Sequence, residues 1–406
     1  MSRKRASETT AKSEPFEPDL KRALDVVMKL MAIPGKSGEE GKVAASISEQ
    51  LRAAGAPADA IQTDKVHLRT PLRSDTGNLV LKLPGSKRGP RRLLSAHLDT
   101  VPICVGSKPV LKGRTVHAAD PATGLGADNR AGAAAILTAA LEILERDLPH
   151  PPVTFCWFIQ EEIGLQGAKR ISKSLLGNPR LAFNWDGGSP VDLSVGATGA
   201  YRMTITVEGL ASHAGGAPEQ GVSAIAIAGR AIADLDRNGW HGKVEKDGEE
   251  GTSNIGVIRG GEATNVVTEL VTLRAEARSH NPVFRKKILT EIETAFERAA
   301  GEVTNVTGTT GNVSIDSALE YESFKLPPDE PCVLSAEAAA RAIGREPTQV
   351  IANGGLDANW LTARGIPSVT MGCGQRDPHT VKETLDLEDF EGACRIALRL
   401  ATATET

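Results

Sequence analysis

Apolar runs of strand length alternate with amphipathic helical segments at both ends of this chain, and this alternation limits the possible folds more than any other feature. The strand-length runs are 78–83, 92–97, 153–159, 181–185, 347–351 and 366–371. The segments with a helical apolar period are 18–32, 38–54, 131–146, 335–343, 358–364 and 387–401. Strands that alternate with helices predict an α/β domain, in which helices cover the faces of a mostly parallel sheet.

Between these two ends the order of segments changes. The middle segments are a strand at 201–208, a helix at 222–235, strands at 254–260 and 269–278, a helix at 282–300 and a strand at 311–321. This strand-helix-strand-strand-helix-strand order is typical of a ferredoxin-like (βαββαβ) sandwich. We therefore expect an inserted domain at 197–315 within a discontinuous α/β domain formed by 18–196 and 316–406. The stretch 241–251 is predicted to be a polar loop.

Composition and charge disfavour several classes of protein. The 406 residues are 40% hydrophobic, enough for a sizeable core, and the net charge of −4 does not favour nucleic acid or an acidic membrane as partner. The five cysteines are dispersed and odd in number, which favours a reducing, cytoplasmic compartment over a disulfide framework. Residues 1–17 lack the apolar region of a signal peptide and are predicted to be a disordered leader. No apolar run is long enough to span a bilayer.

Carboxylates and imidazoles recur at the boundaries of the predicted elements. Four of them end a strand or begin a helix: His97, Asp128, Glu162 and Asp186. The fifth, His379, lies in a polar loop. In open α/β sheets, ligands bind at the edge formed by the carboxyl ends of the strands. Because zinc and similar metals prefer these two ligand types, the five residues together predict one two-metal site.

Each of these residues also has a local explanation that needs no metal. Asp128 could cap the helix that follows it, and Asp186 could shape the turn that it begins. Glu161 and Glu162 could lie in a solvated loop, and His379 could simply be exposed. Two adjacent carboxylates after a buried strand repel each other unless a positive charge lies nearby, and this favours the metal site.

His97 and Asp99 occupy alternate positions of one extended segment, so their side chains share a face. A ligating histidine usually donates its other ring N–H to a carboxylate. Asp99 could be that partner, or it could shape a tight turn after the strand.

These segments resemble the M20 family of co-catalytic metallopeptidases and amidohydrolases, over about residues 20–402. The most specific pieces are His97-x-Asp99, Gly126-Ala127-Asp128, Glu161-Glu162-x-Gly164 and Pro378-His379-Thr380-x-x-Glu383. Their order and spacing together carry the resemblance. It implies a discontinuous α/β/α zinc-peptidase domain with an inserted ferredoxin-like lid, which also serves dimerisation.

The resemblance implies a role for each of the five residues. His97 and Asp186 would hold one divalent ion, Glu162 and His379 would hold the other, and Asp128 would bridge the two. The expected ions are Zn²⁺, with Co²⁺ or Mn²⁺ as alternatives.

Two further catalytic roles follow from the same resemblance. Asp99 would orient His97. Glu161 would be the general base, which takes a proton from a metal-bridging water and passes it to the leaving amine.

The inserted segment supplies more candidates by the same resemblance. Residues 209–215 resemble the family's lid loop, which implies that His213 stabilises the oxyanion, either from its own lid or from the partner subunit of a homodimer. Asn265 and Arg278 resemble residues that bind a substrate carboxylate. Arg274 shares the strand face of Arg278 unless a bulge intervenes, so either arginine could be the one that acts.

Gly355 and Asp357 resemble part of a substrate-cleft loop. The alternative is a Gly-Gly turn that caps the helix at 358–364. Both explanations remain open at this point.

The sequence Asp-Gly-Gly at 186–188 resembles the peptidase T-like (tripeptidase) branch, because deacetylase relatives commonly carry Glu at the first position. Asn129 and Gln160 depart from that branch, in which acidic residues are common there. We therefore predict an aminopeptidase that acts on short peptides. One alternative is an amidohydrolase that acts on N-acyl-amino acids with the same metals. The other is a non-catalytic relative that binds peptides, which predicts loss of Glu161 or of a ligand, and the chain keeps all of them.

Overall fold

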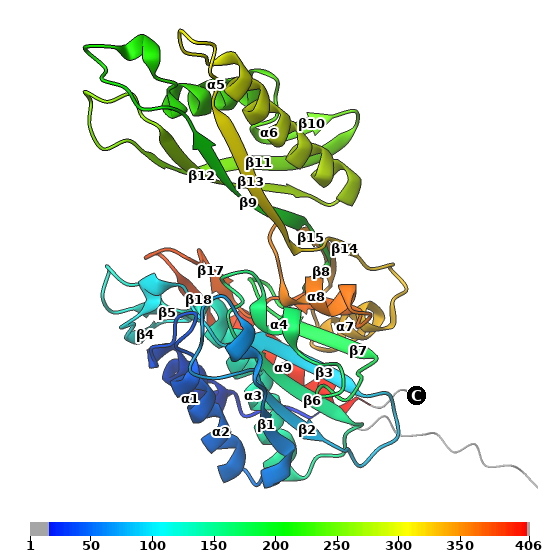
Figure 1. Cartoon of the computed structure of the whole chain (residues 1–406). Coiled ribbons are helices and arrows are strands. Elements are labelled where there is room, and N and C mark those ends of the chain that lie inside the picture. Colours follow the sequence, from blue (N-terminus) through cyan, green and yellow to red (C-terminus); the bar gives the residue numbers. More distant parts are fainter. Residues whose placement is uncertain (1–15, 404–406) are drawn as a thin grey trace, which may run out of the picture.

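The computed structural model describes residues 16–403 and contains a nine-stranded mixed sheet, here called the large sheet (Figure 1). Its strands are β1 (Ile61–Thr63), β2 (Leu79–Leu83), β3 (Arg92–His97), β6 (Val153–Phe158), β7 (Leu181–Trp185), β8 (Asp192–Ala197), β14 (Phe324–Lys325), β15 (Thr348–Ala352) and β16 (Ser368–Met371). Strands β6, β3, β7 and β16 are parallel neighbours at its centre. The predicted α/β fold class is confirmed. Most of the predicted leader, residues 1–15, lies outside the described residues.

Helices cover both faces of the large sheet. One face packs against α1 (Leu20–Ala32), α2 (Gly41–Ala53), α3 (Ala127–Arg146), α7 (Pro331–Ala342) and α9 (Leu387–Thr402). The other face packs against α4 (Gln166–Arg170) and α8 (Asp357–Ala363). Leu94 and Ala96 of β3 face the first layer, and Leu93 faces the second. Burial on both faces explains why these strands read as continuous apolar runs. Within residues 16–403, no helix is long and apolar enough to cross a membrane.

A second, antiparallel sheet of five strands forms what we call the small unit (Figure 1). Its elements are β9 (Gly199–Glu208), α5 (Ala224–Arg237), β10 (Gly242–Lys246), β11 (Glu249–Gly260), β12 (Leu270–Ser279), α6 (Pro282–Glu302) and β13 (Asn312–Tyr321). Its strand order is β10-β11-β12-β9-β13, and α5 and α6 share a separate apolar core with one face of the sheet. The order of elements around β9, β11, β12 and β13 is the expected βαββαβ.

Two details of the small unit differ from the sequence predictions. The predicted polar loop at 241–251 is wrong, because β10 and the start of β11 pair there as a hairpin, from Gly242 opposite Ser253 to Lys246 opposite Glu249. Only Val244 is buried in β10, so the hairpin has too little apolar periodicity to resemble a strand. The boundary predicted after residue 315 falls inside β13, which continues to Tyr321.

A third, four-stranded sheet was not predicted. Its order is β17-β18-β5-β4, and its strands are β4 (Pro109–Lys112), β5 (Thr115–Ala118), β17 (Gln375–Arg376) and β18 (Thr384–Asp386). Strands of two to four residues leave almost no periodic signal in a sequence. This sheet matters for the site, because β17 and β18 hold the two ends of the loop that contains His379.

Candidate metal centre

His97 stands at the carboxyl end of β3, with its two ring nitrogens facing different groups. Its Nδ1 lies 3.1 Å from the backbone oxygen of Asp99 and 3.4 Å from Oδ1 of the same residue. Its Nε2 lies 3.1 Å from Oδ1 of Asp128 and 3.7 Å from Oδ2 of Asp186. With Nδ1 directed at acceptors, Nε2 is the nitrogen available to a metal.

Asp128 lies between two imidazoles. Its Oδ1 faces Nε2 of His97 at 3.1 Å, and its Oδ2 faces Nε2 of His379 at 3.1 Å. The same nitrogen of His379 lies 3.0 Å from Oε2 of Glu162. These two imidazoles hold the pKa of Asp128 well below its usual range, although burial acts in the opposite direction. One carboxylate therefore connects His97, which precedes the inserted segment in the sequence, with His379, which follows it.

Asp99 holds the segment that contains the two glutamates. It is fully buried and accepts hydrogen bonds from the backbone N–H of Glu161 (3.0 Å) and of Glu162 (3.2 Å), and from the Ser37 hydroxyl (2.7 Å). The carboxylate of Glu161 then lies 4.0 Å from Nε2 of His97. Asp99 thus positions the glutamates as well as the ring of His97.

Negative charge accumulates at this edge of the large sheet. Within residues 16–403, no ion pair joins the carboxylates of Asp99, Asp128, Glu161, Glu162 or Asp186 to a lysine or arginine, and their ion-pair partners are the two histidines. Burial and the neighbouring Asp128 raise the pKa of Asp186 to about 8, and burial also raises that of Glu161 well above its usual range. Buried carboxylates without a cation are costly, so this cluster fits divalent metal ions.

The ligand atoms form two overlapping groups. In each group they lie within 4.8 Å of one another: His97, Asp128 and Glu162 in the first, and His97, Glu161 and Asp186 in the second. All five sequence-predicted ligands converge, since His379 contacts both Asp128 and Glu162. Glu161 lies beside the predicted ligand Asp186 in the second group, which places the predicted base next to the ligands.

Two residues near the centre were given no role by the sequence. Glu383 is buried and accepts hydrogen bonds from the backbone N–H of Gly126 (2.7 Å) and of Asp128 (2.9 Å), so it ties the His379 loop to the start of α3. Glu40 accepts from the N–H of Gln160 at 3.1 Å. The Pro-His-Thr-x-x-Glu motif contained Glu383, but its spacing does not show what the carboxylate contacts.

The structure brings together the two loops that hold His213 and Asn265, the loop residues expected from the small unit, and His213 lies opposite Val266. The N–H of Ala214 donates to the backbone oxygen of Asn265 at 2.9 Å. Nδ1 of His213 accepts from the N–H of Gly215 (3.1 Å) and of Gly216 (2.9 Å), which leaves the ring proton on Nε2. Both residues are exposed, and no contact in the described part of the chain joins them to the metal-ligand cluster.

Arg274 and Arg278 share one face of β12. The pairing of β12 with β9 is regular from Leu270 to Ser279, and the irregularity nearby belongs to β11. Arg278 donates to both carboxylate oxygens of Glu276, at 3.0 and 2.9 Å.

Gly355 and Asp357 lie where the small unit meets the large sheet. A Cβ atom at Gly355 would stand 2.7 Å from Cζ of Tyr321, so the loop packs directly on the end of β13. Asp357 is 1% exposed, and neither carboxylate oxygen has a hydrogen-bond partner within residues 16–403. Burial raises the pKa of Asp357 to about 7.

Comparison with known proteins agrees with this geometry. The model of the peptidase family M20/M25/M40 matches residues 93–403. The crystal structure of a tripeptidase from Staphylococcus aureus superposes with a TM-score of 0.85 at 30% identity, covering 95% of this chain and 98% of the other. That of aminopeptidase PepT from Bacillus cereus gives a TM-score of 0.80 at 29% identity, with coverage of 95% and 98%. Peptidase T of Escherichia fergusonii is 25% identical over 384 residues, covering 84% of this chain and 89% of the relative. The chain therefore belongs to the M20 peptidase family, in its peptidase T-like branch, and is a hydrolase of peptide bonds.

Proposed function

We propose that this chain is a two-metal aminopeptidase of the tripeptidase type, which releases the N-terminal residue of short peptides. The observation that carries the proposal is the position of Asp128, whose two oxygens face the imidazoles of His97 and His379 at 3.1 Å each. A carboxylate in this position has the geometry to be shared by two ions. The names of the S. aureus tripeptidase and of the B. cereus aminopeptidase support the choice of substrate.

In this proposal His97 and Asp186 hold one ion, Glu162 and His379 hold the other, and Asp128 is common to both. Two bound cations would polarise the scissile carbonyl and lower the pKa of a water molecule. Imidazole together with carboxylate suits Zn²⁺, and Co²⁺ or Mn²⁺ would be accepted by the same donors.

Glu161 is the proposed general base. Its carboxylate lies beside the ligands, 4.0 Å from Nε2 of His97, and burial raises its pKa, which strengthens it as a proton acceptor. It takes a proton from the attacking water and delivers that proton to the amine that leaves. Asp99 keeps Glu161 in place through the hydrogen bond to its backbone N–H.

We further propose that the small unit is a lid. Only Thr198 separates β8 from β9, and two residues separate β13 from β14, so the two connections form a short hinge. The free Nε2–H of His213 is suited to donate to an oxyanion, from its own lid or from a second copy. Dimerisation through the lid and a cytoplasmic location stay predictions.

A screen of peptides tests the proposal. The Zn²⁺-loaded protein is expected to cleave tripeptides with a free α-amine faster than the same peptides after N-acetylation. Faster cleavage of the acetylated peptides would instead identify an N-acyl-amino-acid amidohydrolase. Absence of cleavage of either kind would contradict both enzymatic assignments.

Replacement of the base separates chemistry from binding. Glu161→Gln is expected to lower kcat by roughly 10²- to 10⁴-fold, because the amide has no proton-accepting carboxylate. Metal content, measured by elemental analysis, should remain near two ions per chain. Wild-type kcat in this variant would remove Glu161 from its proposed role.

A further inference from the structure

The loop that carries Glu161 and Glu162 is a tight turn with an unusual backbone at both ends. The N–H groups of Gly164 and Leu165 both donate to the backbone oxygen of Glu161, at 3.0 and 2.8 Å. Gln160 just before the turn and Leu165 at its end both have a positive φ, 54° and 57°. Residues other than glycine rarely adopt this left-handed conformation, and it persists where the surroundings impose it. We therefore expect contacts that hold the loop at each end.

The domain of the large sheet holds the first end. The backbone N–H of Gln160 donates to Glu40 at 3.1 Å, and its side-chain amide donates to the backbone oxygen of Leu72 at 2.6 Å. Asp99 accepts from the next two backbone N–H groups along the loop. These hydrogen bonds account for the conformation at Gln160, and they leave the far end to other contacts.

The small unit holds the second end. Leu165 is 2% exposed and packs in an apolar cluster with Ala200 of β9 and Tyr321 of β13. A Cβ atom at Gly164 would stand 2.5 Å from Oε1 of Glu320, which also belongs to β13. Figure 1 shows the ends of β9 and β13 reaching the domain of the large sheet beside α8. The carboxylate of Glu320 thus lies directly against the backbone of the glutamate loop.

A β-bulge places Glu320 at this position. The pairing of β13 with β9 is regular up to Leu319 opposite Tyr201, and it then shifts so that Tyr321 lies opposite Ala200. Glu320 is the extra residue between these two pairs. A bulge of this kind redirects a side chain, and bulges are frequent beside active sites.

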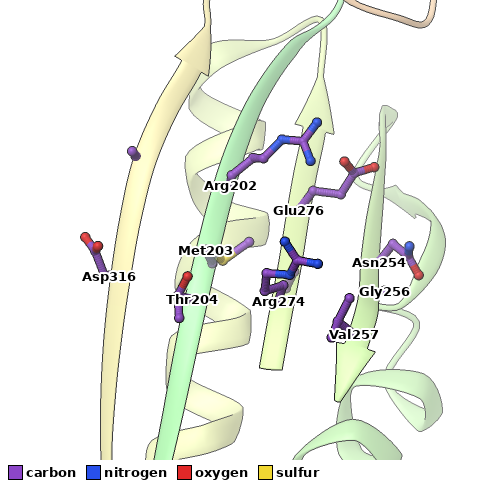
Figure 2. A pocket seen from close by; sticks show the side chains of 11 residues that line it. Arg202, Met203, Thr204, Asn254, Gly256, Val257, Arg274, Glu276 and Asp316 are labelled. Atoms are coloured by element: carbon purple, nitrogen blue, oxygen red, sulfur yellow. The ribbon is translucent and has the colours of Figure 1, made fainter. Parts of the chain in front are cut away.

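Glu320 is itself fixed by contacts from both units. Its carboxylate is paired with Arg202 of β9, and its side chain is only 13% exposed. Figure 2 shows Arg202 at the edge of a hollow of about 460 Å³ on the helix-free face of the small sheet. The backbone oxygen of Glu320 accepts from the indole N–H of Trp360 at 3.1 Å and from Nζ of Lys169 at 3.4 Å. The carboxylate is therefore a firm support for the loop.

We propose that Glu320 is a positioning residue for hydrolysis of the peptide bond, since it holds the loop of Glu161 and Glu162 from the side of the small unit. This inference rests on the proposed function and adds to it a residue that acts through these two glutamates. Asp99 holds the same loop from the opposite side. A displacement of the small unit would move Glu320 and release the loop, so the geometry of the base depends on where the small unit lies.

The test compares the full-length wild type with two variants of Glu320. In saturating Zn²⁺, Glu320→Ala is expected to lower kcat for trialanine roughly tenfold with little change in KM, because the loop moves and the rest of the site does not. Its Zn²⁺ affinity, measured by titration of the metal-free protein, should also fall roughly tenfold, because Glu162 moves with the loop. Glu320→Gln keeps the shape that packs against Gly164, and both values should return close to those of the wild type.

Two further variants separate this role from general effects. Asp316→Ala is the matched control, since it removes an exposed carboxylate from the same strand (Figure 2), and it should leave kcat and Zn²⁺ affinity unchanged. In the Glu161→Gln protein, Glu320→Ala should lower kcat no further, because the effect of Glu320 passes through Glu161. Urea unfolding shows that each variant is folded under the assay conditions. A merely structural role predicts lower stability with an unchanged kcat of the folded protein.

Three results would overturn the inference. The first is a wild-type kcat or a wild-type Zn²⁺ affinity in Glu320→Ala. The second is an equal loss in Asp316→Ala, and the third is a loss from Glu320→Ala that is as large without the Glu161 carboxylate as with it. If the wild type cleaves trialanine, these results contradict the positioning role alone. If the wild type cleaves no peptide, the proposed function fails, and the Zn²⁺ titrations still decide whether Glu320 holds the loop.

Discussion

At the scale of single residues, two carboxylates outside the proposed metal-ligand set hold the segments of residues within it. Asp99 accepts three hydrogen bonds, and two of them come from the backbone of Glu161 and Glu162. Glu383 accepts two from the segment that contains Asp128. Such outer partners orient ligands, and their loss typically weakens metal binding.

Glu383→Gln tests this argument. Both oxygens of Glu383 face backbone N–H groups, so an amide would direct its own NH₂ at one donor and release the loop. We expect Zn²⁺ affinity, measured by titration of the metal-free protein, to fall roughly 10- to 100-fold. Glu388→Gln, a change of an exposed glutamate nearby, should bind Zn²⁺ as the wild type does. Equal affinities of the two variants would show that Glu383 does not position Asp128.

Asp357 gives the metal-free protein a pH-dependent stability. Its folded-state pKa is raised by burial to about 7, above the value in an unfolded chain. Between pH 4 and 7 the folded protein therefore holds a proton that the unfolded chain has released, so stability falls as the pH rises through this interval. Asp357→Asn removes the carboxyl group that binds this proton.

Relative to wild type, the free energy of unfolding that Asp357→Asn gains is expected to be smallest near pH 4. The gain should be on the order of 2–4 kcal/mol larger at pH 8. Urea unfolding of both metal-free proteins at several pH values measures this difference. Most other carboxyls are present in both proteins and cancel in the comparison, whereas Glu161 and Asp186 also lose the nearby charge of Asp357, which raises their pKa in the wild type. A difference that does not change with pH would contradict the raised pKa.

At the scale of elements, the candidate site is formed largely by loops and short strands that connect the longer helices and strands. The loop before α8 packs on the end of β13, where Gly355 leaves no space for a Cβ beside the ring of Tyr321. Gly355→Ala is expected to cost about 1–3 kcal/mol of unfolding free energy through overpacking. At Gly354 a Cβ would meet nothing within 4 Å, so Gly354→Ala should stay within about 0.5 kcal/mol of wild type. Urea denaturation compares them, and equal losses would refute the packing argument.

Long elements were predictable because their signals are local. The helix α3 and the strands β3, β6 and β7 lie close to the ranges expected from apolar periodicity. The hairpin of β10 and the short strands β17 and β18 were missed, since cross-strand pairing stabilises them more than their own composition does, with β11 as the partner of β10 and β5 as a partner of β18.

At the scale of the whole molecule, the metal centre joins distant parts of the chain. His97 ends β3, Glu162 follows β6, and His379 lies between β17 and β18 of the four-stranded sheet. Ions bound only by the folded state would add about 2.7 kcal/mol to the free energy of unfolding when their concentration is 100 times Kd. The unfolding temperature would rise as a result. Thermal unfolding with Zn²⁺ and then with excess chelator should show a rise and its reversal. An unfolding temperature that changes neither with Zn²⁺ nor with chelator would argue against the site.

The α/β fold class and the residue types of the site were determined by the sequence itself, because burial periodicity and ligand chemistry are properties of short segments. His97, Asp128, Glu162, Asp186 and His379 were each ambiguous when taken alone, since a cap, a turn or a solvated loop explains every one of them locally. Only the tertiary structure decided that these side chains converge, with His97, Asp128, His379 and Glu162 linked by contacts of 3.0–3.1 Å and Asp186 at 3.7 Å from His97. It also decided that Glu276 pairs with Arg278, because Arg274 and Arg278 both stand two residues from Glu276 on β12 and spacing alone does not choose between them.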